Sequence, residues 1–146
     1  MKVRDKMTKN IVSVTPDAAI VQVAQLMQKH NVGVIPVVEQ GNLVGIVTDR
    51  DIVLRNIASG KDPKTTPVSS VMTTQVVAVT PDTDVNEVAY KMAENKVRRI
   101  PVVENNKLVG ILSIGDIAAD EKFDMEASKA LSEISKPAKP EQVKEL

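Results

Sequence analysis

The sequence predicts a mixed α/β (α+β) fold of two tandem β-α-β-β-α repeats related by a pseudo-twofold axis. The stretch Val32–Ile52 reappears as Val97–Ile117, 65 residues further on and without a gap. In each copy an apolar stripe of helical period precedes two β-branched runs. Either half of the 146 residues is too short to bury a large core alone, so we expect the two copies to pack together.

Each copy opens with a short apolar-faced turn. Val3 and Met7 lie one helical turn apart, and Val68 and Met72 repeat that spacing. A brief strand is expected next at residues 11–14, where β-branched residues gather.

A helix is expected to start at residues 15–17, a Thr-Pro-Asp sequence. Threonine can cap a helix, proline suits its first position, and aspartate favours its positive end. The apolar stripe that follows is interpreted as core; it comprises Ile20, Val23, Ala24 and Met27 in the first copy and Val85, Val88, Ala89 and Met92 in the second.

Two strands and a second helix complete each copy. Residues 34–38 and 43–47 are β-branched runs on either side of the polar residues 39–42, which is typical of a hairpin. Residues 49–58 then predict a helix that turns four apolar side chains inward: Ile52, Val53, Ile57 and Ala58.

The predicted organisation has four parts. Residues 1–60 form the first repeat, residues 61–67 an exposed linker, and residues 68–120 the second repeat. Residues 121–146 hold a polar helix at 124–134 and, after it, a tail that is expected to be disordered.

Composition argues against several classes of function. Nineteen acidic residues balance nineteen basic ones, so we expect neither a nucleic-acid nor a membrane partner. No apolar segment is long enough to span a bilayer or resembles an export signal, which favours a cytoplasmic protein. With no cysteine, one histidine (His30) and no glycine-rich phosphate loop, we expect neither catalysis nor a metal site.

The motif Thr48–Asp51 and its echo Ser113–Asp116 each follow an apolar strand and open a helix. A hydroxyl residue followed three residues later by an acid forms a capping box, which satisfies free backbone N–H groups. The same helix end can offer N–H groups and a hydroxyl to a phosphate, while the carboxylate accepts both hydroxyls of a ribose. Both interpretations stay open, because one element can play both roles.

These residues carry a family resemblance. A Met-Thr opening, a Thr-Pro-Asp turn, an Ile-Pro-Val-Val strand and a Leu-Val-Gly-Ile-x-Thr/Ser-x-x-Asp end occur twice, in that order, over roughly residues 1–120. Each copy resembles the CBS domain, and the tandem resembles a Bateman module. The resemblance implies a regulatory homodimer that needs no cofactor and binds an adenosine-containing ligand (AMP, ADP, ATP or S-adenosylmethionine) in two clefts between the repeats.

By this resemblance, each cleft combines the Thr/Ser-x-x-Asp motif of one repeat with a pocket from the other. Asp51 would hold the ribose hydroxyls and Thr48 would contact phosphate, which cationic side chains would neutralise. The first cleft is therefore expected to comprise Ile46, Thr48 and Asp51 from one repeat and Val77, Lys96, Val97, Arg98, Arg99 and Ile100 from the other.

The second cleft is expected to be less basic, because Gly33 and Val34 stand where the other copy has Arg98 and Arg99. Losing two charge-assisted contacts of about 1.5–3 kcal/mol each would cost at least tenfold in affinity. We therefore expect weaker phosphate binding, a less charged adenosine derivative or an empty cleft. This cleft would set Ile111, Ser113 and Asp116 against Val12, His30, Asn31, Val32, Gly33, Val34 and Ile35.

Three hypotheses of function follow. The first is a sensor in which aliphatic side chains hold the adenine, since Tyr90 and Phe123 are the only aromatics, and ligand binding passes a shape change to an effector protein. The second is a dimeric interaction scaffold that works without ligand. The third, DNA binding through Arg50 and Arg55, is disfavoured because acidic residues interleave the two arginines.

Overall fold

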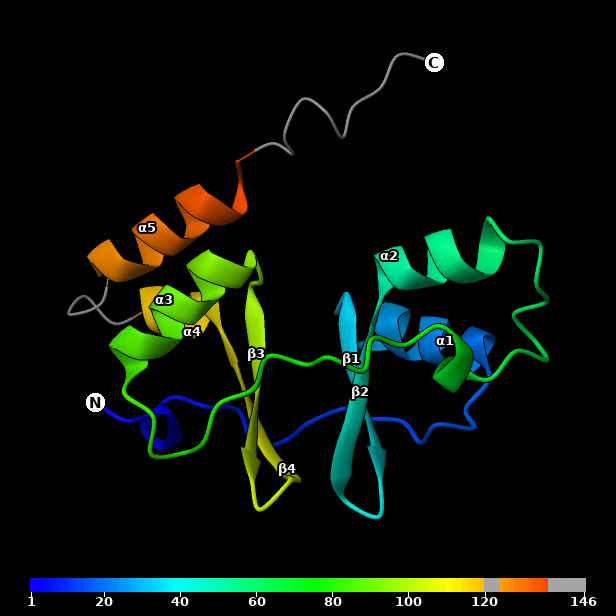
Figure 1. Cartoon of the computed structure of the whole chain (residues 1–146), viewed down its shortest axis with the longest axis horizontal. Helices are drawn as coiled ribbons and strands as arrows, with labels where there is room; N and C mark the ends of the chain where they lie inside the picture. The colour runs from blue at the N-terminus through cyan, green and yellow to red at the C-terminus, as the bar shows by residue number, and fades with distance from the viewer. Residues whose placement is uncertain (120–123, 137–146) are drawn as a thin grey trace.

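In the computed structural model the chain forms two similar halves that share one antiparallel sheet (Figure 1). The structure describes residues 1–119 and 124–136. The strand order is β1-β2-β4-β3, with β1 at Val34–Glu39, β2 at Asn42–Thr48, β3 at Arg99–Glu104 and β4 at Lys107–Ser113. The mixed helix and strand content confirms the predicted fold class.

Helices flank each hairpin. In the first half they are α1 (Ile20–His30) and α2 (Asp49–Ile52), which continues into the π-helical turn η2 (Val53–Ile57). In the second half they are α3 (Val85–Asn95), α4 (Ile114–Ala118) and α5 (Asp124–Ile134). Short 3₁₀ turns form η1 (Val3–Asp5) and η3 (Val68–Ser70). Helices α1 and α3, strands β1 and β3, and strands β2 and β4 begin 65 residues apart, as the repeat requires.

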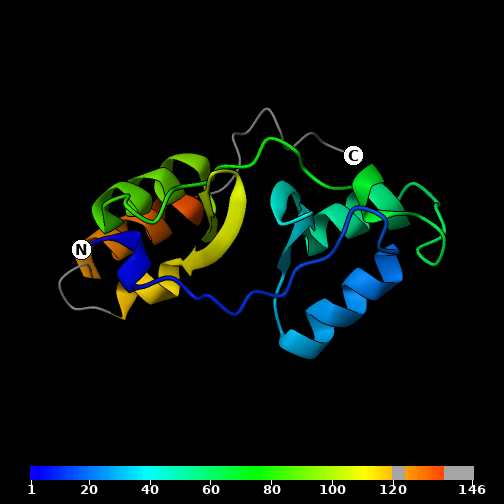
Figure 2. The ribbon, with the colours of Figure 1, turned by 90° about the horizontal axis from the view of Figure 1, so that it is seen from below.

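The opening turn of each copy packs into the core of the other half. The Val3 N–H donates to the Thr83 carbonyl (2.9 Å), and the Val68 N–H donates to the Ala18 carbonyl (2.8 Å). Both valines are fully buried, Val3 with α3 and β3 and Val68 with α1 and β1. Figure 2 shows the two connecting segments running from one half to the other. The sequence repeats and the packed halves therefore do not coincide.

Two glycines allow these segments to pass over the strands. A Cβ atom at Gly45 of β2 would lie 2.7 Å from Met72 Sδ and 2.9 Å from the Thr73 carbonyl oxygen. A Cβ atom at Gly110 of β4 would lie 2.5 Å from Met7 Sδ. The repeated glycine is thus required by a close approach between segments, because any side chain there would separate the strand from the segment that crosses it.

The predicted start of the first helix is wrong by several residues. Residues 15–17 form a turn instead, in which the Ala18 N–H donates to the Thr15 carbonyl (3.1 Å) and α1 begins only at Ile20. The Thr15 hydroxyl donates to the Asp17 carboxylate (2.5 Å), which lowers the pKa of Asp17. Helix formation is delayed because the carbonyls of Pro16 and Ala18 accept hydrogen bonds from the crossing segment. The strand expected at 11–14 reduces to a single bridge between Val14 and Val37.

The inward face predicted for residues 49–58 is also only partly right. Ile52 is buried, whereas Val53 and Ile57 are 55% and 54% exposed and Ala58 is exposed. The wider π turn, in which the Ala58 N–H donates to the Val53 carbonyl (2.8 Å), shifts the angular position of each following side chain. As a result Asn56 is fully buried instead. On α1, Ala24 of the predicted stripe is exposed, while its three other members are buried.

Helix α5 covers the second half only. It lies across α3 and α4 (Figure 1) and buries Ala127 and Ala130, which are 3% and 1% exposed. Its bounds are those expected from the sequence. The tail expected to be disordered after this helix lies, from residue 137 onward, outside the described residues.

Replacing Gly45 with alanine is expected to destabilise the fold by about 1–3 kcal/mol, because the added methyl group meets the backbone carbonyl of Thr73. Gly110→Ala is expected to cost less, since the three nearest atoms there belong to the Met7 side chain and none to the backbone. Urea denaturation measures both free energies of unfolding. The control is Gly115→Ala in α4, where the nearest atom lies 3.6 Å away; equal losses in all three variants would contradict the crossing geometry.

Candidate functional site

Both strand-to-helix junctions contain the predicted capping boxes. At the end of β2, the Thr48 N–H donates to Asp51 Oδ2 and the Asp51 N–H donates to Thr48 Oγ1, each at 3.0 Å. At the end of β4, the Ser113 N–H donates to Asp116 Oδ2 (2.9 Å) and the Asp116 N–H donates to Ser113 Oγ (3.1 Å). The structural role of both motifs is therefore confirmed.

The first-turn N–H groups of α2 are all used within the chain. The Asp49 N–H donates to the Gly33 carbonyl (3.0 Å), and the Arg50 N–H donates to Asp49 Oδ1 (2.8 Å). The third group is the capped Asp51 N–H. In this structure none of these three N–H groups is free for a phosphate, which leaves the cationic side chains of the opposite repeat as the groups available to an anion near this helix end.

The first cleft, of about 400 Å³, lies between the two halves where β2 ends and β3 begins. It gathers three cationic side chains from the second repeat and one carboxylate, Asp49, from the first. Aliphatic groups from both repeats complete its walls. Its lining is Gly33, Val34, Ile46, Thr48, Asp49, Lys96, Val97, Arg98 and Arg99.

The second cleft, of about 290 Å³, lies at the pseudo-symmetric position where β4 ends and β1 begins. Its charged groups are one carboxylate, Asp116, and one guanidinium, Arg99. Three neutral polar residues add hydrogen-bonding groups. Its lining is Thr8, Asn10, Ile11, Val12, Val32, Val34, Pro36, Arg99, Ile111, Ser113 and Asp116.

Several residues expected in the clefts lie elsewhere. Ile35 and Ile100 are fully buried in the two cores, because side chains alternate along a strand and these two face the helices instead of the clefts. Val77 packs on the second core, and His30 and Asn31 line neither cleft. Gly33 lines the first cleft instead of the second.

Asp51, expected to hold a ribose, does not line the first cleft. Its side chain is only 14% exposed and lies 3.9 Å from the Arg55 Nε. Arg55 in turn donates to the Val71 carbonyl (3.1 Å), so it is engaged within the fold. Asp49, two residues earlier, presents the carboxylate to this cleft, and a Cβ atom at Gly33 would approach its Oδ2 to 3.0 Å.

Sequence reasoning missed three contributions to the second cleft. One is the segment that includes Thr8, whose N–H donates to the Ile111 carbonyl (2.8 Å) as the chain crosses between halves. The second is Arg99, which is paired with Ser113 in the sheet register. The third is Pro36 of β1. The pairing of Arg99 with Ser113 could have been foreseen from the hairpin, but the crossing of Thr8 could not.

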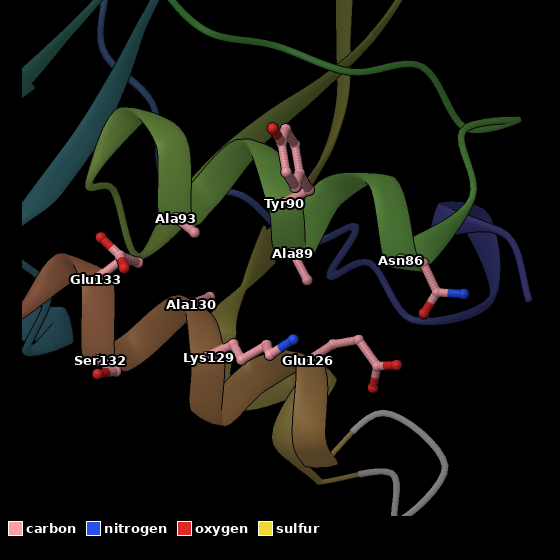
Figure 3. Close-up of a pocket in the computed structure, with 9 residues that line it drawn as sticks. All are labelled: Asn86, Ala89, Tyr90, Ala93, Glu126, Lys129, Ala130, Ser132 and Glu133. Atoms are coloured by element: carbon pink, nitrogen blue, oxygen red, sulfur yellow. The ribbon is translucent and has the colours of Figure 1, made fainter.

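A third hollow, of about 480 Å³, lies between α3 and α5 (Figure 3). Its floor is formed by Ala89, Ala93 and Ala130, and the carboxylates of Glu126 and Glu133 stand at its rim. It is larger than either cleft, and its charged groups are these two carboxylates and the single ammonium of Lys129. The excess of negative charge makes it a poorer site for a phosphate than the first cleft. Tyr90 rises from α3 on the side away from α5 and lies outside both clefts.

In the part of the chain that the structure describes, no helix combines the length and apolarity that a bilayer crossing requires. Within residues 1–119 and 124–136, no three His, Cys, Asp or Glu side chains gather as a metal ion would need.

Comparison with known proteins identifies the repeat. Residues 3–56 and 68–120 each match the CBS domain. The CBS domain-containing protein YhcV of Bacillus subtilis (strain 168) is 46% identical over 133 residues, which cover 91% of this chain and 94% of that protein. The chain therefore belongs to the CBS domain family, and its two repeats form a CBS pair, which is a regulatory module.

Solved structures agree with this assignment. The crystal structure of Hypoxic Response Protein I, with two coordinated zinc ions, superimposes with a TM-score of 0.76 at 32% identity over 82% of this chain and 98% of that one. The CBS domain pair of protein MJ0100, in complex with 5′-methylthioadenosine and S-adenosyl-L-methionine, gives 0.72 at 30% identity over 82% and 94%.

Lys96 adopts a left-handed backbone conformation that is unfavourable for lysine. It caps α3 with φ 55°, in the left-handed region, where its counterpart after α1 is Asn31 with φ 53°. Asparagine adopts this conformation more readily than lysine. Lys96→Asn is expected to raise the free energy of unfolding by up to about 1 kcal/mol, and Asn31→Lys to lower it by a similar amount. Urea denaturation measures the free energy of unfolding of both variants. If neither differs from wild type, the left-handed conformation at Lys96 is not strained.

Proposed function

We propose that this protein is a ligand-sensing regulatory module that binds adenosine-containing ligands of the AMP, ADP and ATP class between its two repeats. In this proposal the first cleft takes the nucleotide. The observation that carries it is the gathering of Lys96, Arg98 and Arg99 at the mouth of a partly aliphatic cleft. The bound CBS pair of MJ0100 supports the ligand class, since both its ligands are adenosine derivatives.

The first cleft has the chemistry that a nucleotide needs. Two guanidinium groups and one ammonium outnumber the single carboxylate of Asp49, and guanidinium groups suit bidentate phosphate contacts. Ile46 and Val97 offer apolar surface for the adenine, and the Thr48 hydroxyl adds a polar contact. The second cleft, with one cation and one carboxylate, suits S-adenosylmethionine or a less charged derivative.

The sheet provides a joint on which a ligand can act. Strands β2 and β4 pair at Asn42 and Lys107 alone, with the Leu43 N–H donating to the Asn106 carbonyl (3.0 Å) beside them. The first cleft lies at the other end of β2, at Thr48, about 20 Å from this joint. A ligand that bridges both halves there favours the arrangement that it fits, and this population shift would change the shape of the dimer presented to an effector protein.

The main alternative is a dimeric scaffold that works without ligand. Catalysis is not part of either proposal, because the chain has no cysteine and its single histidine lies outside both clefts. The DNA-binding hypothesis loses support, since the Arg55 guanidinium donates hydrogen bonds to the backbone carbonyls of Val71 and Met72.

The partner proposed for the first half is a second copy of the chain. Val53, Leu54 and Ile57 are about half exposed on η2. In the second half the positions 65 residues after Val53 and Leu54 are Ala118 and Ala119, and Ala118 shares a hollow with Ala127 and Leu131 of α5. The first half thus presents large apolar side chains where the second half presents small ones. A twofold contact between two first-half faces would bury these large side chains.

Ligand binding can be measured by a thermal-shift screen with AMP, ADP, ATP and S-adenosylmethionine. A ligand at about 100 times its dissociation constant is expected to stabilise the protein by about 2.7 kcal/mol. Arg98→Ala is expected to weaken ADP binding at least tenfold in calorimetry, because one charge-assisted contact is lost. Lys64→Ala, an exposed cation outside both clefts, serves as the control. A flat response to all four ligands would favour the scaffold.

The dimer can be tested independently of any ligand. Leu54→Asp is expected to convert a dimer into a monomer in sedimentation velocity at micromolar concentration, because a buried, unpaired carboxylate opposes association. Met125→Asp, at a 72% exposed apolar residue on α5, is the matched control and should leave the dimer intact. A wild-type monomer, or a dimer that survives Leu54→Asp, would contradict the proposed interface.

A further inference from the structure

Two residues line both clefts: Val34 of the first repeat and Arg99 of the second. They occupy equivalent positions, each as the first residue of an edge strand, and they stand opposite Thr48 and Ser113 in the sheet register. The two clefts therefore adjoin at this pair. The first repeat supplies an uncharged side chain to the boundary, and the second supplies a guanidinium.

Arg99 is available to either cleft. Its side chain is exposed, and among the described residues it has no hydrogen bond or ion pair. In the first cleft it adds to two further cations, Lys96 and Arg98. In the second cleft it is the one cation of the lining, beside the carboxylate of Asp116.

We propose that Arg99 is shared between the two clefts and couples them negatively, so that the pair binds one anionic ligand at a time and leaves the other cleft to an uncharged one. The inference rests on the proposed function and extends it to regulation. One guanidinium cannot make its full set of donor contacts to two phosphate groups in different clefts. A phosphate in the first cleft thus withdraws the cation on which an anion in the second cleft depends.

A second effect acts in the same direction. Once the first cleft holds a phosphate, its negative charge opposes another anion across the shared boundary, and the Asp116 carboxylate already lies in the second cleft. Removing one charge-assisted contact corresponds to at least a tenfold loss of affinity, or about 1.4 kcal/mol. An uncharged nucleoside does not need Arg99, so adenosine in the second cleft escapes this penalty.

NMR titration with ADP separates the clefts, because some backbone amides belong to one lining only. Val97 reports on the first cleft, and Val12 reports on the second. In the wild-type protein the chemical-shift change of the Val12 amide is expected to reach its midpoint at an ADP concentration at least tenfold higher than the midpoint for the Val97 amide. With adenosine as the probe, saturating the first cleft with ADP should leave the Val12 midpoint unchanged.

The decisive variant combines Lys96→Asn with Arg98→Ala, which removes the two cations that belong to the first cleft alone. Arg99 is then free for the second cleft, so the Val12 midpoint for ADP is expected to fall about tenfold relative to wild type. Arg99→Val should instead raise the Val12 midpoint at least tenfold and the Val97 midpoint by less. If the Val12 midpoint is the same in the double variant as in wild type, the clefts are independent and the coupling is refuted. ADP that shifts neither amide would refute the proposed function as well.

Discussion

The structure depends on a reciprocal crossing, in which the opening segment of each repeat completes the core of the other half. Two pairs of backbone hydrogen bonds fix it, between Thr8 and Ile111 and between Thr73 and Ile46. The methionine just before each threonine, Met7 or Met72, packs over a glycine of the strand below. Without this exchange, the halves would meet through the single strand pair of Asn42 and Lys107. The crossing therefore holds the two repeats in the relation that creates clefts between them.

The same constraint determines what the clefts can recognise. Capping boxes and hairpin contacts engage the first-turn N–H groups of α2, so in the proposed function the contacts to a charged ligand come from side chains of the opposite repeat. Those side chains differ between the copies, with Arg98 in one and Gly33 in the other. A symmetric backbone thus carries an asymmetric charge distribution. The joint and the clefts lie at opposite ends of the central strands, so in the proposed function a ligand in a cleft acts on the joint at a distance.

Much of the fold could be predicted because the repeat supplies independent evidence for each element. The hairpins, both capping boxes and the bounds of α5 follow from local patterns of apolar and polar residues. In the candidate site, the carry-over from the family placed Arg98, Thr48 and Ser113 in the linings where the structure has them.

The failures share a cause, which is that contacts distant in sequence override local patterns. The Thr-Pro-Asp sequence has the local features of a helix start. In the fold, however, the crossing segment donates to carbonyls there, with the Ser69 N–H bonded to the Pro16 carbonyl and the Val68 N–H to the Ala18 carbonyl. The π turn buries Asn56 and exposes Ile57, reversing what a regular helical period implies. Asp51 matches the ribose-binding position of the motif, yet its carboxylate is occupied by its own helix end and by Arg55.

The claim that the first cleft binds the nucleotide is tested most directly by a crystal structure from crystals grown with saturating ADP. The account predicts one ADP in the first cleft, with its adenine between Ile46 and Val97 and its phosphates against the guanidinium of Arg98. ADP bound instead in the hollow between α3 and α5, or two clefts left empty at saturation, would contradict it.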